Sequence, residues 1–191
     1  MNIMKKNLLV VAVALLACSM LSCSGELTDD SSPVELVVTN SQTLNVIDIG
    51  PNTDDDCDQN VGTINMQVIP KNASATGNLL QVRVNRYRVS YQRTDGGTQV
   101  PAPFVRSIDT LIGVGTSASL ATFTILEADA LNQAPFAALQ PQNGGRDPQT
   151  GRPVVKMEVI VEIFGETLGG DNVYDATRFP LDFCYDCGGC S

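Results

Sequence analysis

Residues 155–163 read VKMEVIVEI, and this alternation, in which only Ile160 departs from a polar second face, decides the fold class of the chain. A repeat of two residues is typical of a half-buried β-strand. One face of the expected strand is apolar throughout, with Val155, Met157, Val159, Val161 and Ile163. A second apolar face follows the glycine-rich residues 165–172, with Val173, Phe179, Leu181 and Phe183. We expect an antiparallel hairpin with a long loop, in which Pro180 places the second strand near an edge or a bulge.

Further segments of the same kind come earlier in the chain. They lie at residues 34–38, 44–49, 64–70, 79–94, 104–114 and 119–126. Within residues 79–94 the apolar phase changes between Val84 and Tyr87, which predicts a β-bulge near Asn85-Arg86. Seven or eight strands predict an all-β fold, an antiparallel β-sandwich that is immunoglobulin-like in architecture, with a small β-barrel as the alternative.

Two later segments do not follow the alternation. Pro135 limits residues 127–139 to one or two helical turns, because proline breaks a longer helix. Residues 141–153 are rich in Gly, Pro, Asn and Gln. This composition predicts a mobile surface loop.

The first 23 residues predict the destination of the protein. Lys5 and Lys6 precede the apolar residues 8–16, and a small residue stands before each of two cysteines, in Ala17-Cys18 and Ser22-Cys23. A positively charged N-terminal region, a short apolar run and a small residue before the cleavage site are typical of a secretory signal peptide. Because a cysteine would follow the cleavage site, this segment resembles the lipobox of bacterial lipoproteins. The resemblance implies an acylated cysteine, a location in the bacterial cell envelope and attachment to the membrane through lipid.

Either cysteine could carry the lipid. Leu15-Leu16-Ala17-Cys18 has leucine at the usual lipobox position, whereas Met20-Leu21-Ser22-Cys23 has methionine there. Cysteine parity favours Cys23, because the four cysteines that then remain can all pair in an oxidising compartment. A plain cleaved signal without lipid is one alternative. A transmembrane helix is another, but the uncharged residues 7–22 fall short of the ~20 residues that span a bilayer.

The expected segments of the chain follow from the choice of Cys23 as the lipidated residue. Residues 1–22 form the signal peptide, residues 23–33 the lipidated cysteine with a flexible tether, and residues 34–191 a single domain. By analogy with enteric lipoproteins, Ser24 (or Ser19) after the lipidated cysteine permits sorting to the outer membrane.

The mature chain is acidic and has no histidine. Two of the 12 basic residues and none of the 21 acidic residues lie in the signal, so the mature net charge is 10 minus 21, or −11. This charge argues against nucleic acid and anionic lipid headgroups as partners. Without histidine, the chain lacks the usual general base and the commonest zinc ligand, although carboxylate chemistry stays open. We expect no cofactor other than the covalent lipid.

The C-terminal cysteines form the strongest chemical motif. Cys184, Cys187 and Cys190 have Cys-x-x-Cys-x-x-Cys spacing, and Cys57 lies far upstream. In an exported protein we expect two disulfides, one of them linking the Cys57 loop to the C-terminal tail and contributing ~4 kcal/mol by loop closure. A four-thiolate zinc or iron–sulfur site is the alternative.

An acidic segment surrounds Cys57. Asp54, Asp56, Asp58 and Asn60 alternate as the calcium ligands of one loop do, and they resemble the start of an EF-hand loop. Gln59 stands where that loop requires glycine. We therefore favour a solvated acidic loop over a calcium site.

Basic side chains gather on one expected strand. They are Arg83, Arg86, Arg88 and Arg93, with Tyr87 and Tyr91 between them. An anionic ligand, or a sugar stacked on the tyrosines, could bind there. A strand surface protected from aggregation by its charge is the favoured interpretation.

Two classes of function remain. We favour a lipid-anchored, non-catalytic binding or structural domain that contacts an envelope protein or a glycan. The alternative is an envelope enzyme such as a glycosidase, which needs two carboxyl groups ~5–9.5 Å apart. Its candidate carboxylates are Asp109, Glu127, Asp129, Glu158, Glu162 and Asp171. A lipoprotein that binds metal through its C-terminal cysteines is a further alternative.

Overall fold

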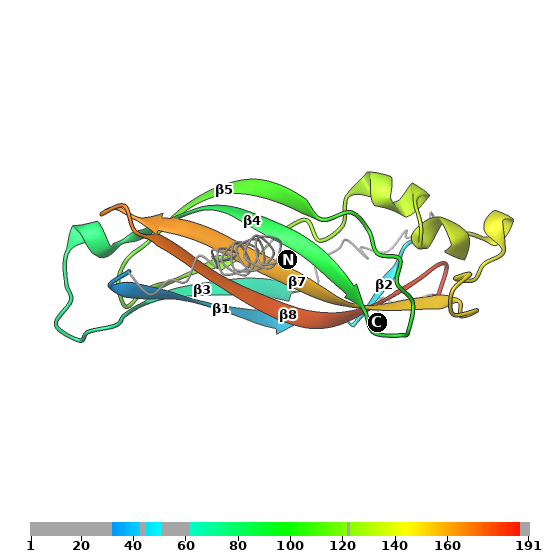
Figure 1. The fold of residues 1–191 in the computed structure, drawn as a ribbon, viewed down its shortest axis with the longest axis horizontal. Helices are drawn as coiled ribbons and strands as arrows, with labels where there is room; N and C mark the ends of the chain where they lie inside the picture. Colours follow the sequence, from blue (N-terminus) through cyan, green and yellow to red (C-terminus); the bar gives the residue numbers. More distant parts are fainter. Residues whose placement is uncertain (1–31, 43–44, 51–61, 122, 188–191) are drawn as a thin grey trace, which may run out of the picture.

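The computed structural model describes residues 32–42, 45–50, 62–121 and 123–187. In these ranges the chain forms eight strands and several short 3₁₀ turns, arranged as two β-sheets in an elongated molecule (Figure 1). The strands are β1 Val34–Gln42, β2 Val46–Asp48, β3 Gly62–Pro70, β4 Val82–Arg93, β5 Phe104–Ile112, β6 Ser117–Leu120, β7 Val154–Thr167 and β8 Asn172–Cys184. The 3₁₀ turns are η3 Asn78–Leu80, η4 Ala128–Asn132, η5 Phe136–Leu139 and η6 Pro141–Asn143.

The sheet topology confirms the expected all-β sandwich. One sheet has the order β1-β3-β6 and the other the order β2-β8-β7-β4-β5, and only the short pair β2–β8 is parallel. With β1, β3 and β6 as strands A, B and E, and β4, β7 and β8 as strands C, F and G, this is the immunoglobulin-like plan. The chain changes sheets between β1 and β2, so these two successive strands belong to different layers of the sandwich. The hallmark tryptophan of immunoglobulin domains is absent from the sequence.

The β7–β8 hairpin forms as predicted, and its apolar face lines the core. The side chains on that face are buried at Val155, Met157, Val159, Val161, Ile163, Val173, Phe179, Leu181 and Phe183. The loop is shorter than predicted, because β7 continues through Gly165 to Thr167. A Cβ atom at Gly165 would lie 3.0 Å from both the Arg83 carbonyl oxygen and Val82 Cγ1. This glycine therefore permits close packing within a strand and does not mark a turn.

The predicted β-bulge in β4 is confirmed. Between Val84 and Arg86 the pairing register with β7 shifts, so Asn85 is the extra residue of β4. The shift brings the two apolar phases of this strand onto one face. As a result, Val84 and Tyr87 both point into the core.

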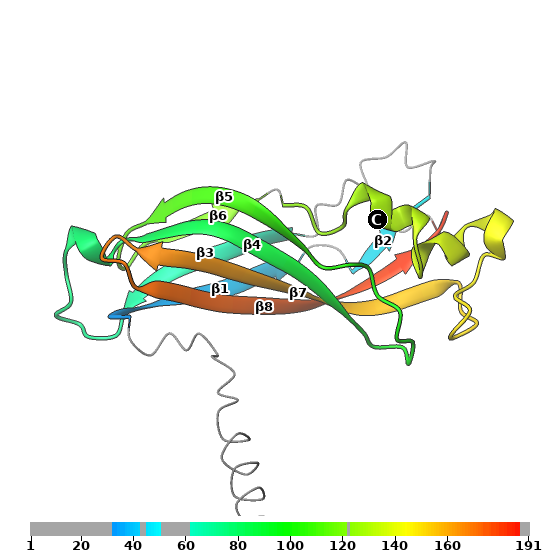
Figure 2. The same ribbon diagram turned by 45° about the horizontal axis from the view of Figure 1, so that its top comes forward.

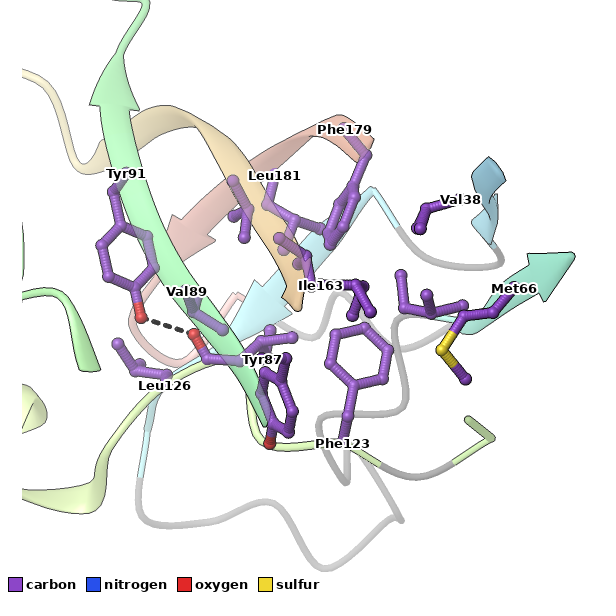
Figure 3. Packing of buried hydrophobic residues seen from close by; sticks show 14 of the residues in the cluster. Val38, Met66, Tyr87, Val89, Tyr91, Phe123, Leu126, Ile163, Phe179 and Leu181 are labelled. Atoms are coloured by element: carbon purple, nitrogen blue, oxygen red, sulfur yellow. Dashed lines mark hydrogen bonds between the residues drawn. The ribbon is translucent and has the colours of Figure 1, made fainter. Parts of the chain in front are cut away.

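The predicted strand over residues 119–126 is wrong beyond Leu120, where β6 ends. Phe123, Ile125 and Leu126 are buried without belonging to a strand. Two core tyrosines take the place of a ladder partner (Figure 3): Tyr91 donates a hydrogen bond to the Ile125 carbonyl (2.5 Å), and the Tyr87 hydroxyl accepts one from the Thr124 N–H (3.1 Å). Because side chains satisfy this backbone, the segment can be buried in an irregular form.

The helical turns predicted over residues 127–139 are confirmed as η4 and η5. They cover one end of the sandwich, where the Phe136 ring packs against Phe183 with centroids 4.9 Å apart. The predicted surface loop over residues 141–153 is mostly exposed, but Asp147 within it is fully buried. An ion pair with Arg93, on β4, anchors the loop at that residue. Composition misses this contact because it reports average polarity rather than a single long-range pair.

Candidate functional site

The C-terminal cysteines are the first predicted site. Cys184 and Cys187 form a disulfide at the end of β8, which agrees with the preference for disulfides over metal. The Asp48 carboxylate holds this turn, because it accepts hydrogen bonds from the N–H groups of Asp186 and Cys187, each at 2.8 Å. Among the residues that the structure describes, no group of three or more side chains could hold a metal ion.

Several predicted site residues lie outside the described residues. They are the lipidation candidates Cys18 and Cys23, the cysteines Cys57 and Cys190, and the candidate calcium ligands Asp54, Asp56, Asp58 and Asn60. The lipid anchor, the second disulfide and the calcium interpretation therefore stay predictions.

The idea that a sugar stacks on the tyrosines of β4 is wrong. Tyr87 and Tyr91 point into the core, since the bulge turns their face inward. Burial and the nearby Glu127 carboxylate raise the pKa of Tyr91, so its hydroxyl stays protonated as the donor to Ile125. These two rings belong to the core and are not a ligand platform.

Arg93 also faces away from the expected surface. Its side chain is 1% exposed and lies between two acidic side chains that are themselves fully buried. Arg93 donates to both carboxylate oxygens of Asp95 (2.7 and 2.9 Å) and to Asp147 Oδ2 (2.8 Å). Burial alone would raise the pKa of Asp95, but hydrogen bonds from Arg93, Lys156 N and Gly97 N outweigh it and hold that pKa well below its usual range. This buried triad is structural.

The remaining arginines of β4 lie on the outer face of the five-stranded sheet, mostly in ion pairs. Arg83 donates to both carboxylate oxygens of Asp109 at 2.8 Å, and Arg88 lies 3.4 Å from Glu162. Arg86 instead stacks over an aromatic ring, with its guanidinium carbon 4.7 Å from the centroid of Phe164. The strand is therefore not an open anion site, because acidic neighbours already neutralise much of its charge.

The Phe164 contact is part of a row that crosses three strands. Arg86 on β4 stands opposite Phe164 on β7, which stands opposite Tyr174 on β8. The two rings lie with centroids 5.2 Å apart at an angle of 44°, and the Tyr174 hydroxyl donates to Glu162 at 3.2 Å. We call Arg86, Phe164 and Tyr174 the outer-face ladder. A cation over a ring and a tilted ring pair each stabilise such a row.

Sequence reasoning missed the outer-face ladder. The expected strand ended at Ile163, although the alternation that puts Glu162 outward continues to Phe164. Tyr174 follows Val173 on the opposite face of β8 by the same rule. That signal was available, but only the strand register shows that these side chains meet Arg86.

The candidate carboxylates of the enzyme alternative are dispersed. Four of them lie in ion pairs: Asp109 with Arg83, Glu127 with Arg106, Glu158 with Arg178 and Glu162 with Arg88. Glu158 and Glu162 share the outer face of β7, yet four residues along a strand separate them by ~13 Å. The Asp171 carboxylate, in the β7–β8 loop, accepts a hydrogen bond at 3.2 Å from the hydroxyl of Thr167, the last residue of β7.

Comparison with known proteins adds no family. No protein-family model, no curated protein and no solved structure matches this chain. Within the described residues, no helix is both long enough and apolar enough to span a bilayer.

Proposed function

We propose that this chain is a lipid-anchored cell-envelope protein whose β-sandwich domain is non-catalytic and binds an envelope protein through the outer-face ladder. The anchor rests on the resemblance of residues 1–23 to lipoprotein signals, with Cys23 as the acylated residue. The binding role rests on one observation, the row on the outer face of the five-stranded sheet in which half-buried Phe164 lies between exposed Arg86 and Tyr174.

The chemistry of this row suits a protein partner. Tyrosine, phenylalanine and arginine are the residues enriched at the centres of protein interfaces, where they contribute most of the binding energy. The stacking contacts hold Phe164 between its two neighbours, so little side-chain freedom is lost on binding. The ion pairs beside the row, Arg88–Glu162 and Arg178–Glu158, would form a polar rim.

The support for a non-catalytic domain comes from the carboxylates. Most of the candidate carboxylates form ion pairs with arginine. The two on β7 are ~13 Å apart along the strand, farther than the catalytic carboxyl groups of glycosidases. Hydrogen bonds from Arg83, together with its charge, lower the pKa of Asp109, so this carboxylate stays ionised and does not suit a general acid.

The anchor is tested by the intact mass of the protein purified from its own membrane, before and after reduction and alkylation. We expect a chain that begins at an acylated Cys23 and has no alkylatable thiol until it is reduced. Because Cys184 and Cys187 are joined, parity then leaves Cys57 and Cys190 as the second pair. A chain that begins at Cys18, or one without acyl groups, would overturn this assignment.

The binding role is tested by crosslinking in intact cells and isolation of the full lipidated protein. We compare Arg86→Glu and Tyr174→Ser with Val100→Ser, an exposed apolar position away from the ladder. The proposal expects one protein partner that is recovered with the wild type and the control but reduced at least ~10-fold in both ladder variants, the effect of a hot-spot residue. Equal recovery with all variants would refute the role of this face, and loss of a glycan instead of a protein would change the partner class.

A further inference from the structure

Exposed apolar side chains are concentrated at one end of the sandwich. Of the seven large apolar side chains that are exposed in the described residues, four lie where β3, β5 and β7 end. They are Leu79 (65% exposed), Leu111 (54%), Leu168 (47%) and Ile69 (38%). Figure 2 shows η3 and the β7–β8 loop projecting together at this end. Isolated exposed leucines need no explanation, but a group of them marks an interaction surface.

Backbone hydrogen bonds join the segments that carry Leu79 and Leu168. Leu168 N–H donates to the Gln81 carbonyl and Gly169 N–H donates to the Leu79 carbonyl, both at 2.8 Å. The β7–β8 loop and the η3 segment therefore form one unit, which presents both side chains outward. The fold therefore fixes the backbone positions from which Leu79 and Leu168 project.

The expected tether joins the domain at this same end. Val34, the first residue of β1, stands opposite Pro70, the last residue of β3. Directly beside this pair, the Lys71 N–H donates to the Pro33 carbonyl at 3.0 Å. Only nine residues lie between Cys23 and Pro33, and even a fully extended chain over these ten Cα–Cα steps reaches no more than ~35 Å. A lipid on Cys23 would keep this end of the domain close to the membrane surface.

We propose that the end formed by Ile69, Leu79, Leu111 and Leu168 lies against the bilayer, with Leu79 and Leu168 inserted at the level of the lipid headgroups and upper acyl chains. This inference rests on the lipid anchor of the proposed function. Apolar contact, rather than charge, would drive it, since the mature chain is acidic. The anchor makes insertion intramolecular, so modest apolar contact suffices.

This contact would orient the domain. The strands of the five-stranded sheet would stand away from the membrane, with β4 starting at the bilayer. Arg86 lies four residues from the start of β4, so the outer-face ladder would be ~13 Å above that end. At this height, a partner that is itself attached to the same membrane can reach the ladder.

The absence of tryptophan allows a direct test. Leu79→Trp, Leu168→Trp and, as control, Val100→Trp are each made in the full chain and purified with their lipid. Val100 follows Gln99, whose carbonyl accepts a hydrogen bond from Arg93 at the opposite end of β4. Each protein is reconstituted into phosphatidylcholine vesicles with and without brominated acyl chains, which quench only a nearby indole. Intact mass and thermal unfolding confirm acylation and folding of each variant.

We expect Leu79→Trp and Leu168→Trp to emit at shorter wavelength in vesicles than in detergent-free buffer and to lose intensity in brominated lipid, while Val100→Trp changes in neither respect. Acylated protein whose Leu79→Trp and Leu168→Trp signals are not quenched would overturn the inference and leave the anchor intact. Equal quenching of all three positions would also overturn it, because the domain would then lie flat. Protein without acyl groups would instead refute the anchor itself.

Discussion

Replacing Arg93 by methionine removes the cation of the buried triad while keeping an apolar stem of similar length. Wild-type Arg93 donates to Asp95 (2.7 and 2.9 Å), to Asp147 (2.8 Å) and to the Gln99 carbonyl (3.2 Å). Asp95 and Asp147 have fully buried side chains, so the variant would leave two carboxylates in the interior without a counter-charge. Loss of one partner from a buried ion pair costs ~3–5 kcal/mol.

That cost is a large part of the whole stability of a domain, which is typically ~5–15 kcal/mol. Asp147→Asn is the matched control. It takes the triad from a net charge of −1 to zero, keeps an acceptor for Arg93, and leaves the bidentate Arg93–Asp95 pair intact. The Asp147 Oδ1 atom also has no hydrogen-bond partner among the described residues. We therefore expect Asp147→Asn to cost no more than ~1.5 kcal/mol, the range of one hydrogen bond.

Urea unfolding followed by far-ultraviolet circular dichroism measures both variants. We expect the free energy of unfolding to fall by ~3–5 kcal/mol for Arg93→Met and much less for Asp147→Asn. Hydrogen exchange should also rise in residues 141–153, which the triad anchors to β4. If Arg93→Met unfolds within ~1 kcal/mol of the wild type, the argument that the triad is a buried charge cluster is wrong.

Three further predictions concern the buried carboxylates of the triad, the Tyr91 hydroxyl and Gly165. In the folded domain the pKa of Asp95 and that of Asp147 lie below their unfolded values. Both carboxylates therefore stabilise the fold above the unfolded pKa of about 4, and the free energy of unfolding should decline as the pH falls from 5 towards 2. An unchanged urea midpoint over that range would contradict this prediction. Tyr91→Phe leaves the Ile125 carbonyl without its buried donor and should lower the free energy of unfolding by ~1–3 kcal/mol, measured by urea unfolding; no loss would mean that water replaces the hydroxyl. Gly165→Ala places a methyl group 3.0 Å from the Arg83 carbonyl oxygen and should lower the free energy of unfolding by ~1–3 kcal/mol in the same assay. An unchanged free energy would show that β4 and β7 can separate slightly.

Much of the fold was predictable from local pattern. Alternation in residues 155–163 identifies both the strand and its buried face, because successive side chains of a strand point to opposite sides. The phase change between Val84 and Tyr87 predicts the β-bulge on the same grounds, and the structure confirms it. The expectation that Cys184 and Cys187 form disulfides rested on the predicted export of the chain, and the structure joins these two residues.

Other features depend on contacts between distant residues. Alternation predicts that the strand extends to Leu126, yet the described residues 123–126 belong to no strand, and the hydroxyls of Tyr87 and Tyr91 bind the Thr124 N–H and the Ile125 carbonyl. Asp147 sits in a polar loop, yet it is buried because Arg93 lies at the end of β4. In both cases the deciding partner is tens of residues away, so no local window contains the answer.

The order of residues along the chain is enough to identify the apolar faces, the position of the bulge and the placement of cysteines and charges. The neighbours of these residues emerge only in the folded domain. There Arg86, Phe164 and Tyr174 form one row, Arg93 is internal, and Leu79 and Leu168 project at the end where Pro33 joins the domain. Side-chain alternation is a property of one strand, whereas strand order and register arise from the packing of the whole sandwich.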